Sequence, residues 1–322
     1  MKWFVFLLPI LILLILFLYF ALSGTCRLPA QTADPSYLSW MADIPDDTPL
    51  CQVVMPGSHD AGTVGMPWPV ETQHCSIASQ LSFGARYFDL RINRTPRGLV
   101  IYHSIFNGQA FSNVLIELKT FLAEHPSEVL ILDFQHFKND CSLNVFSLLS
   151  SELNDAGLAV RNTTDLSDSD FIRSLTIGQV RGKCLLFFGE TEENFSNWIF
   201  LRNDDRCSRS DTVLDSYYYG EHHKAGFHSL VQLAHPEYFS RNAEKLSSET
   251  NGLFVLQCQL TDGSLIRGPW ALERAQEEQM SAYVRSLASS EHLGALNIIM
   301  RDFLTPAKCA DIIALNQAKG IN

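Results

Sequence analysis

Two histidines lie at positions from which their side chains could do chemistry. His59 comes just past the apolar run at residues 53–55, and His103 directly follows the run at residues 99–102. Between them, a third apolar run carries Asp89 and Arg91. Histidine gives and takes protons near neutral pH, and arginine can hold two oxygens of a phosphate group. These residue types indicate general acid–base chemistry on a phosphodiester.

In each of the three apolar runs, the residue that could do chemistry lies near the C-terminal end. Residues 52–55, 87–92 and 99–102 are typical of strands, and each run delivers a titratable or charged side chain near its C-terminal end. A (β/α)₈ barrel keeps its active site at the face formed by the carboxyl ends of its strands. We therefore expect these side chains, together with Asp302 from the last strand, to lie at one mouth of a barrel.

The rest of the chain continues the alternation of strand and helix. Apolar runs predict further strands at residues 129–132, 184–188, 253–258 and 297–300, and a capped amphipathic segment before Pro126 predicts a helix. No sixth strand is recognisable between Glu190 and Ser240. The alternation predicts the α/β class and a (β/α)₈ TIM barrel that forms a single domain over residues 49–322.

The N-terminal segment has a different composition. Residues 3–22 contain no charged side chain, and roughly twenty apolar residues can cross a bilayer. Residues 1–24 are therefore predicted to form a transmembrane helix that acts as a signal-anchor, followed by a polar linker at residues 25–48. Lys2 then favours a single-pass membrane protein with a lumenal or extracellular barrel. The alternative is a cleaved signal peptide and a secreted barrel.

Charge and cysteine content narrow the range of partners. The formal net charge of −11 disfavours nucleic acid and a polybasic membrane-docking surface. An anionic lipid would have to be attracted by local charge around Arg91. The eight cysteines are an even number and predict disulfides, whereas the absence of a Cys-x-x-Cys pair disfavours a zinc site.

Four short motifs together resemble a known family. They are, in chain order, Pro56-Gly57-Ser58-His59-Asp60, Gly84-Ala85-Arg86-Tyr87-Phe88-Asp89-Leu90-Arg91, Tyr102-His103, and His125-Pro126-Ser127-Glu128-Val129-Leu130-Ile131-Leu132-Asp133-Phe134. The set resembles the X domain of phosphatidylinositol-specific phospholipase C, and its last motif is most similar to the small single-domain members. A fainter match returns at residues 297–303. The resemblance is firm in the first half of the barrel region and thin from about residue 137 to residue 294.

The family pattern implies a role for each matching histidine and its partner. His59 would be the base that deprotonates the inositol 2-hydroxyl, and His103 the acid that protonates the departing diacylglycerol oxygen. Asp60 would orient His103, and Asp302 would orient His59. For Asp302, which rests on the fainter match, a charge at a helix N-terminus is the alternative.

Arg91 distinguishes two branches of the family. The animal signalling members have a calcium-binding acidic residue at this position, and the metal-independent bacterial members have arginine. The resemblance therefore implies a catalytic arginine, no metal and no other cofactor. Asp89 would position Arg91 or the substrate, or else form a salt bridge with Arg86. Gln135 is a candidate substrate-binding residue.

The chain departs from the bacterial pattern on the side that would hold the inositol ring. Bacterial members place a lysine on the fourth strand and an arginine on the fifth. Here the corresponding positions are Gln135 and residues 188–189, which carry no charge. The identity of the head group therefore stays open.

Together these features predict a phosphodiesterase that cleaves a phosphatidylinositol-type glycerophospholipid at a membrane surface. The products would be diacylglycerol and a cyclic inositol phosphate. One alternative is a related phosphodiesterase that acts on a different or glycosylated head group. Another is a non-catalytic barrel that binds phospholipid head groups, because a fold alone does not establish an activity.

Overall fold

The fold is described from a computed structural model that covers most of the chain. The structure describes residues 9–15, 34–189, 195–202, 253–260 and 268–321, together with the backbone of residues 214–217. All statements below concern these residues.

The centre of the fold is a parallel sheet that carries the chain's most apolar runs. Its strands follow the order β7-β6-β5-β2-β1-β10-β9-β8. Their bounds are β1 (Met55–Ser58), β2 (Tyr87–Thr95), β5 (Val129–Lys138), β6 (Lys183–Phe188), β7 (Phe200–Leu201), β8 (Leu214–Tyr217), β9 (Leu253–Gln257) and β10 (Ile298–Arg301). Every pair along this path is parallel.

The predicted closed barrel is wrong in one respect. Among the described residues β7 and β8 form the two ends of the sheet and do not pair with each other, so the sheet is a half-barrel. These two strands fall in the region where no sixth strand was recognised. They are short, and β7 pairs with β6 only through Phe200 and Leu201. An α/β barrel-type arrangement therefore holds, but complete closure does not.

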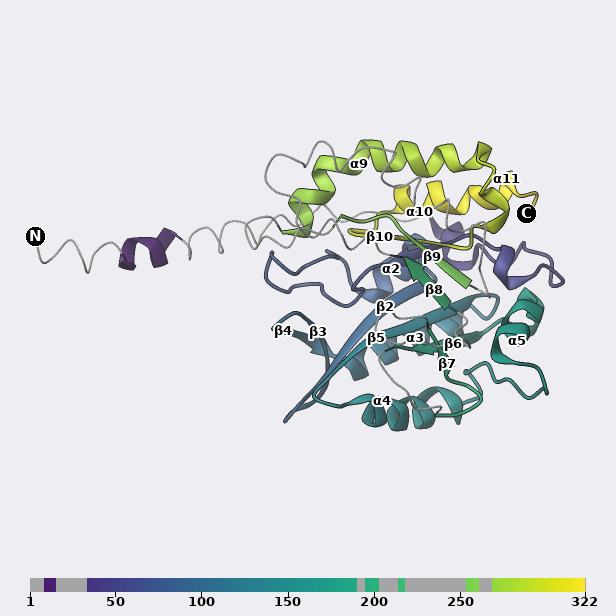
Figure 1. The fold of residues 1–322 in the computed structure, drawn as a ribbon, viewed down its shortest axis with the longest axis horizontal. Helices are drawn as coiled ribbons and strands as arrows, with labels where there is room; N and C mark the ends of the chain where they lie inside the picture. Colours follow the sequence, from purple (N-terminus) through teal and green to yellow (C-terminus); the bar gives the residue numbers. More distant parts are fainter. Residues whose placement is uncertain are drawn as a thin grey trace, which may run out of the picture.

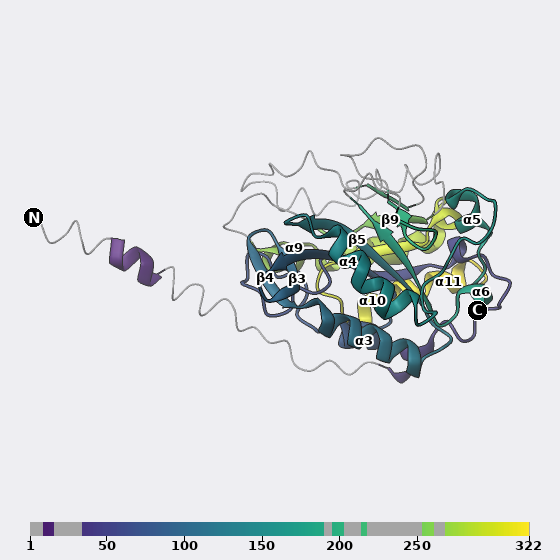
Figure 2. The ribbon, with the colours of Figure 1, turned by 90° about the horizontal axis from the view of Figure 1, so that it is seen from below.

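The run at residues 99–102 is not a barrel strand, contrary to the prediction. Strands β3 (Gly98–His103) and β4 (Phe106–Ala110) form antiparallel pairs, β3 with β2 and β4 with β3. A parallel connection needs a crossover of a dozen residues or more, but Thr95 pairs directly with Gly98 across a tight turn. The chain therefore leaves the sheet at the end of β2 and folds back as a hairpin, at one end of the molecule in Figures 1 and 2.

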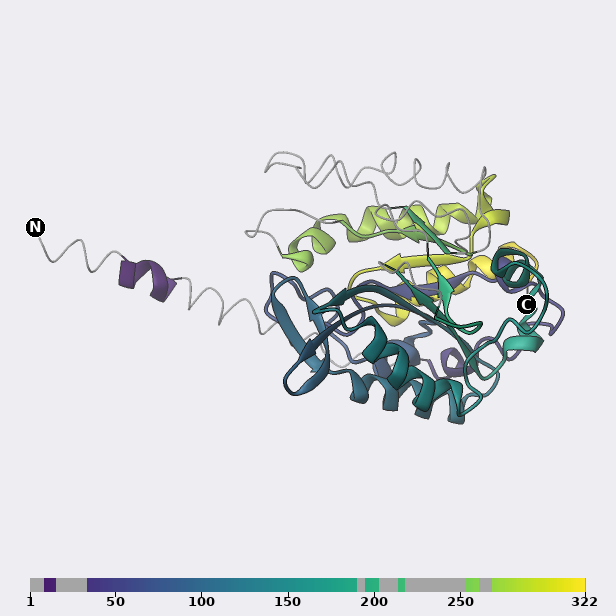
Figure 3. The ribbon, with the colours of Figure 1, turned by 60° about the horizontal axis from the view of Figure 1, so that its bottom comes forward.

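Helices cover the outer face of the curved sheet. Helices α3 and α4 pack against the outer side chains of β5, and α9 and α10 pack against those of β9 and β10, so that α9 and α10 lie across the curved sheet from α4 (Figures 1 and 3). The helices are α2 (Ile77–Phe83), α3 (Phe111–Glu124), α4 (Ser142–Leu149), α5 (Asp168–Ser174), α6 (Ile177–Val180), α9 (Pro269–Ser286), α10 (Pro306–Ile313) and α11 (Leu315–Ala318). Short 3₁₀ turns at Pro35–Ser39 and Leu50–Gln52 precede β1.

Side-chain alternation along the strands separates an inner core from an outer one. On β5, Ile131 packs with Tyr87 and Phe187 inside the curve of the sheet, whereas Leu130 and Leu132 pack with the residues of α3 and α4. Successive residues of a strand point to opposite faces. The same alternation continues past the apolar layers and sets which polar residues point inward at the carboxyl ends of the strands.

The structure contradicts the predicted transmembrane helix and single-pass signal-anchor. None of the described helices is long and apolar enough to cross a membrane. The predicted division into residues 1–24, 25–48 and 49–322 stays a prediction.

The predicted disulfides are also wrong for the described cysteines. All six of them are free thiols, namely Cys51, Cys75, Cys141, Cys184, Cys258 and Cys309. Burial raises the pKa of Cys184 and of Cys258 to about 12, so both remain protonated thiols at neutral pH. Cys26 and Cys207 lie outside the described residues.

A fully buried ion pair fixes the amino-terminal end of the sheet. Arg86 Nε donates to Glu128 Oε2 at 2.7 Å, and Arg86 Nη2 donates to the carbonyls of Tyr37 and Leu38 at 2.9 and 3.0 Å. Glu128 Oε1 accepts a hydrogen bond from the Met41 amide at 3.1 Å. The pair therefore ties the segment before β1 to the strands β2 and β5.

Replacement of Glu128 should strongly destabilise the fold. In Glu128→Ala the buried Arg86 guanidinium loses its carboxylate partner, so we expect the free energy of unfolding to fall by about 3–5 kcal/mol in urea denaturation. The matched control is Glu152→Ala, which removes the partner of Lys119 from a pair whose side chains are 42% and 37% exposed. That loss should be about 0–1 kcal/mol. Equal effects of the two substitutions would show that the buried pair does not fix the fold.

Candidate active site

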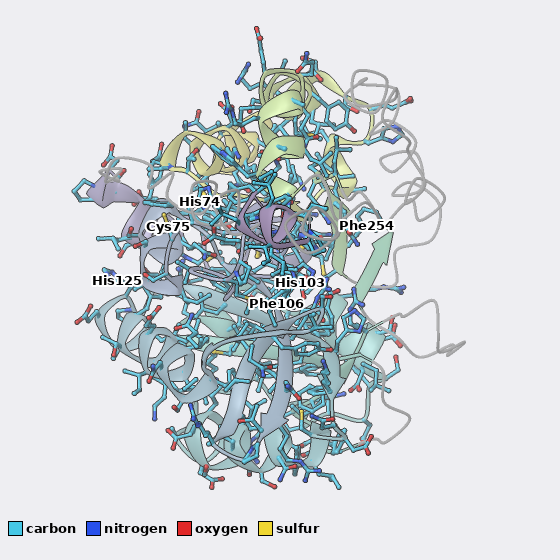
Figure 4. The ribbon with its side chains drawn as sticks, turned by 90° about the vertical axis from the view of Figure 1, so that its left-hand side faces the viewer. His74, Cys75, His103, Phe106, His125 and Phe254 are labelled. Carbon is cyan, nitrogen blue, oxygen red and sulfur yellow. The ribbon has the colours of Figure 1, made fainter. Side chains whose placement is uncertain are left out.

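Three neighbouring strands and one hairpin bring the candidate residues together. His59 and Asp60 follow β1, Asp89 and Arg91 lie on β2, and Asp302 follows β10. Strand β1 pairs with β2 on one side and with β10 on the other, so the carboxyl ends of these strands are adjacent. His103 reaches the same place at the end of β3, and Figure 4 shows it near the middle of the face seen there.

His59 is surrounded by carboxylates. Its Nδ1 donates to Asp302 Oδ1 at 2.7 Å, and its Nε2 lies 3.3 Å from Asp60 Oδ2 and 3.9 Å from Asp89 Oδ2. Burial alone would lower the pKa of His59, but the charges of Asp60, Asp302 and Asp89 reverse this and raise it to about 9. The imidazole is therefore held in one tautomer and has a high affinity for a second proton.

His103 is held at its other ring nitrogen. Its Nδ1 donates to the Val70 carbonyl at 2.7 Å, which leaves Nε2 to face Asp60 Oδ2 at 3.5 Å. The side chain is 20% exposed, compared with 11% for His59. His103 is thus the more accessible of the two imidazoles, and it lies on the hairpin rather than on a strand of the parallel sheet.

Asp60 connects both histidines to Arg91. Its Oδ1 lies 2.5 Å from Arg91 Nε, while its Oδ2 faces the Nε2 atoms of both His59 and His103. Burial would raise the pKa of Asp60, but the charges of Arg91 and the histidines lower it to about 2. Asp60 is therefore an anion at neutral pH and favours the protonated form of His59.

Asp89 pairs with Arg91 and not with Arg86. Arg91 Nη2 lies 3.5 Å from Asp89 Oδ2, whereas Arg86 is paired with Glu128 at the other end of the sheet. The two aspartates, Asp60 and Asp89, thus orient the guanidinium from two sides. Their charges raise the pKa of Arg91, although burial acts in the opposite direction.

Gln135 belongs to a second polar group inside the curve of the sheet. Its Nε2 donates to Asp133 Oδ2 at 3.3 Å, and the same oxygen accepts a hydrogen bond from the Tyr87 hydroxyl at 2.5 Å. Arg202 Nε lies 3.1 Å from this oxygen as well. Burial raises the pKa of Asp133 to about 6, even though Arg202 lowers it.

Arg202 is a residue that sequence reasoning missed. The bacterial pattern placed an arginine on the fifth strand, and Gly189 stands near that position. A Cβ atom on Gly189 would come within 2.9 Å of Arg202 Cδ, so the arginine of the neighbouring strand fills the space beside this glycine. The signal in the sequence was weak, because Arg202 follows the short strand β7 in a region where no strand was recognised.

Two residues of the loop after β1 were also missed. The side-chain amide of Gln73 donates to the carbonyls of His59 and Arg301, each at 3.1 Å, and its oxygen accepts from the Leu304 amide at 2.9 Å. Thr72 Oγ1 donates to the carbonyl of His59 or of Asp60, both at 3.2 Å. These contacts link β1 to β10 beside the histidine. Nothing in the sequence pattern indicates them.

One group of candidate ligands could come close to a metal ion. A nitrogen of His59 and carboxylate oxygens of Asp60 and Asp89 lie within 4.8 Å of one another. Arg91 already faces both carboxylates, and a cation would have to replace its guanidinium. This donor set does not suit a resident metal while Arg91 is in place, although the metal-independence of the reaction stays a prediction.

Comparison with known proteins gives a family match for part of the chain and relatives for most of it. Residues 47–188 match the family model described as "Phosphatidylinositol-specific phospholipase C, X domain". The chain is 28% identical over 290 residues to the 1-phosphatidylinositol phosphodiesterase of Listeria monocytogenes, covering 86% of this chain and 84% of that protein. It is 34% identical over 137 residues to PI-PLC X domain-containing protein 3 of Danio rerio, covering 31% of this chain and 42% of that protein.

Solved structures support the same conclusion at the level of the fold. Phosphatidylinositol-specific phospholipase C from Listeria monocytogenes aligns with a TM-score of 0.64 and 22% identity, covering 87% of this chain and 98% of that one. A variant of the Staphylococcus aureus enzyme aligns with a TM-score of 0.66 and 15% identity, covering 86% and 97%. The resemblance that the motifs carried is confirmed. Residues 47–188 of this chain match the X domain of phosphatidylinositol-specific phospholipase C.

The charge around His59 leads to a measurable prediction. We expect its imidazole to titrate with a pKa of about 9 when followed by NMR of histidine-labelled protein. An ordinary histidine titrates near about 6.5. Replacement of Asp302 by asparagine removes a negative charge that stabilises the imidazolium, so the pKa should fall in Asp302→Asn. A wild-type His59 that is neutral at pH 7 would contradict this account of the site.

Proposed function

We propose that the chain is a phosphatidylinositol phosphodiesterase that works by acid–base catalysis at a membrane surface. It cleaves a phosphatidylinositol-type glycerophospholipid to diacylglycerol and a cyclic inositol phosphate, without metal. The observation that carries the proposal is the arrangement of two imidazoles around one carboxylate, beside a guanidinium. The name of the Listeria relative, 1-phosphatidylinositol phosphodiesterase, supports the same reaction.

His59 acts as the base in this proposal. Its Nδ1 is committed to Asp302, so Nε2 is the atom that takes the proton of the inositol 2-hydroxyl. The hydroxyl oxygen then forms a bond to phosphorus. Because Asp302 stabilises the resulting imidazolium, it makes the transfer of the proton easier. The imidazole must first be neutral, so activity should rise with pH as His59 loses its proton.

His103 completes the reaction as the acid. With Nδ1 bound to the Val70 carbonyl, its Nε2 proton is the one available to the glycerol oxygen that leaves phosphorus. The bond from phosphorus to that oxygen breaks, and diacylglycerol departs with the proton. The step requires the imidazolium form of His103, whose Nε2 faces Asp60 Oδ2 at 3.5 Å. One proton is taken up by His59 and one is released by His103, so the two steps balance.

Arg91 stabilises the phosphate as its charge develops. The guanidinium is planar and presents several donors in a fixed fork, which matches two phosphate oxygens. Asp60 and Asp89 orient this fork, and Asp60 also faces both imidazoles. The phosphate is therefore placed between base and acid, with Arg91 alongside.

Gln135 and Arg202 are proposed to face the head group. Both are buried side chains next to Asp133, and residues of this layer point toward the inside of the curved sheet. The alternative of a different head group rests on the absence of charged residues at Gln135 and residues 188–189. Arg202 supplies a positive charge on this side of the site, which makes that alternative less favoured. The site also retains the groups that the reaction needs, which disfavours a purely head-group-binding role.

The two histidines are the direct test of the proposed function. We expect His59→Ala and His103→Ala each to lower turnover of phosphatidylinositol by about 10²–10⁴-fold, because each removes one proton transfer. The products of the purified protein should be followed by phosphorus NMR over a panel of head groups. His125→Ala is the control, since His125 binds Ser39 away from the candidate site, and it should retain activity. Near-normal turnover in a folded His59→Ala or His103→Ala variant would show that the role proposed for that histidine is wrong.

Arg91 provides a separate test of metal independence. Activity should persist in excess EDTA, because the guanidinium supplies the positive charge that a metal would otherwise provide. Arg91→Lys should still lose most of its turnover, since an ammonium is a point charge and cannot reproduce the bidentate contact. The measurement is turnover in EDTA compared with turnover in added calcium. Restoration by calcium of a protein inactive in EDTA would assign the charge to a metal instead.

A further inference from the structure

Lys308 is a buried cation that the proposed reaction does not use. It lies on α10 and is only 4% exposed, although lysine is rarely buried unless it is paired. Its Nζ donates to the carbonyl of Asp302 at 3.0 Å and to the carbonyl of Phe303 at 2.9 Å. The same Nζ lies 2.6 Å from Glu273 Oε1. The ammonium thus holds the backbone of the residue that contacts His59.

Glu273 anchors this ammonium to the helix layer. It is 1% exposed and accepts hydrogen bonds from Arg301 Nη2 at 2.9 Å and from the Gln276 amide at 2.7 Å. Burial would raise the pKa of Glu273, but Arg301 and Lys308 lower it to about 2. Glu277, which is partly exposed, adds a second carboxylate 2.8 Å from Lys308 Nζ. Glu273 is therefore an anion at neutral pH and contacts both Arg301 and Lys308.

The turn that Lys308 holds is conformationally unfavourable. Phe303 has a φ of 46°, in the left-handed region that costs a non-glycine residue about 1 kcal/mol or more. The loop after β1 holds the turn from the other side, because the Phe303 amide donates to the Thr72 carbonyl at 2.7 Å. Lys308 supplies the contacts from the helix side. Without them, the turn has a lower-energy backbone conformation available.

The direction of the Asp302 side chain depends on this turn. Asp302 Oδ1 accepts from His59 Nδ1 at 2.7 Å, a short distance that leaves little room for displacement. A shift of about 1 Å in a positioned catalytic group can cost about a hundredfold in rate. Any relaxation of the Asp302–Phe303 backbone is therefore transmitted to the imidazole, even though Lys308 does not touch it.

We propose that Lys308 is a positioning residue for the His59–Asp302 pair, and that Glu273 keeps its ammonium in place. The proposal rests on the proposed function for its effect on turnover. Its structural part, the dependence of the His59–Asp302 hydrogen bond on Lys308, is independent of any substrate.

A second lysine provides a matched control. Lys319 Nζ also donates to two backbone carbonyls, those of Gly294 at 3.2 Å and Leu296 at 2.9 Å. It follows α11 and has no contact with the candidate site among its hydrogen bonds. Lys308→Met and Lys319→Met therefore remove the same kind of clamp at two places. Lys308→Gln is a milder variant in which a shorter amide can still donate, for use if Lys308→Met does not fold.

Two readouts should be compared in the folded variants. We expect Lys308→Met to lower kcat by about tenfold to a hundredfold with little change in KM, and Lys319→Met to change kcat by less than about twofold. The far-downfield proton signal of the His59 Nδ1–H, assigned by its loss in Asp302→Asn, should weaken or move in Lys308→Met alone. Lys308→Gln should give an intermediate result in both measurements.

The outcomes separate the two proposals. Loss of the downfield signal in Lys308→Met supports the positioning role even if the wild-type protein hydrolyses no phosphoinositide, in which case only the proposed function fails. If the signal and kcat in Lys308→Met match those in Lys319→Met, Lys308 is merely structural and the inference is wrong. If Lys308→Met does not fold, the same conclusion follows when Lys308→Gln keeps a wild-type signal and a wild-type kcat.

Discussion

The Asp60 carboxylate is the group on which the rest of the site depends. It is fully ionised and buried, and it faces Arg91 and both imidazoles at once. A buried charge is costly unless it is paired, and removal of one partner leaves the others uncompensated. The candidate active site is therefore a single electrostatic unit. Its histidines, arginine and aspartates cannot be considered as independent additions to a stable scaffold.

The central strands could be predicted because burial on both faces leaves a continuous apolar signature. Residues 129–132 and 184–188 became β5 and β6 for this reason. Strands β7 and β8 were missed because each is short, and their pairing depends on neighbours that are distant in the chain. The run at residues 99–102 has the composition of a barrel strand. The tight turn before it decides the direction of the strand, and the pattern of apolar runs contains no information about that turn.

Only some residues of the candidate site could be predicted from the sequence. Residues His59, Asp60, Asp89, Arg91 and His103 could be named because they lie within motifs on consecutive segments, and the structure brings them together with Asp302. The groups that hold them in place could not. The Val70 carbonyl, Gln73 and Lys308 act through contacts to backbone atoms, and such contacts leave no pattern of residue types. Arg202 was missed because its strand was missed.

The hairpin has a consequence for how the protein responds to heat or denaturant. His59 follows β1 of the parallel sheet, whereas His103 belongs to the hairpin of β3 and β4. All residues of β1 and β10 are buried, but most residues of β3 and β4 are not. Segments with few buried apolar contacts open locally at a lower free energy than a buried core. Opening of this hairpin separates the proposed acid from the proposed base while β1, β2 and β10 remain paired. The arrangement of acid and base that the proposed function requires is therefore expected to be lost under milder conditions than the folded sheet itself.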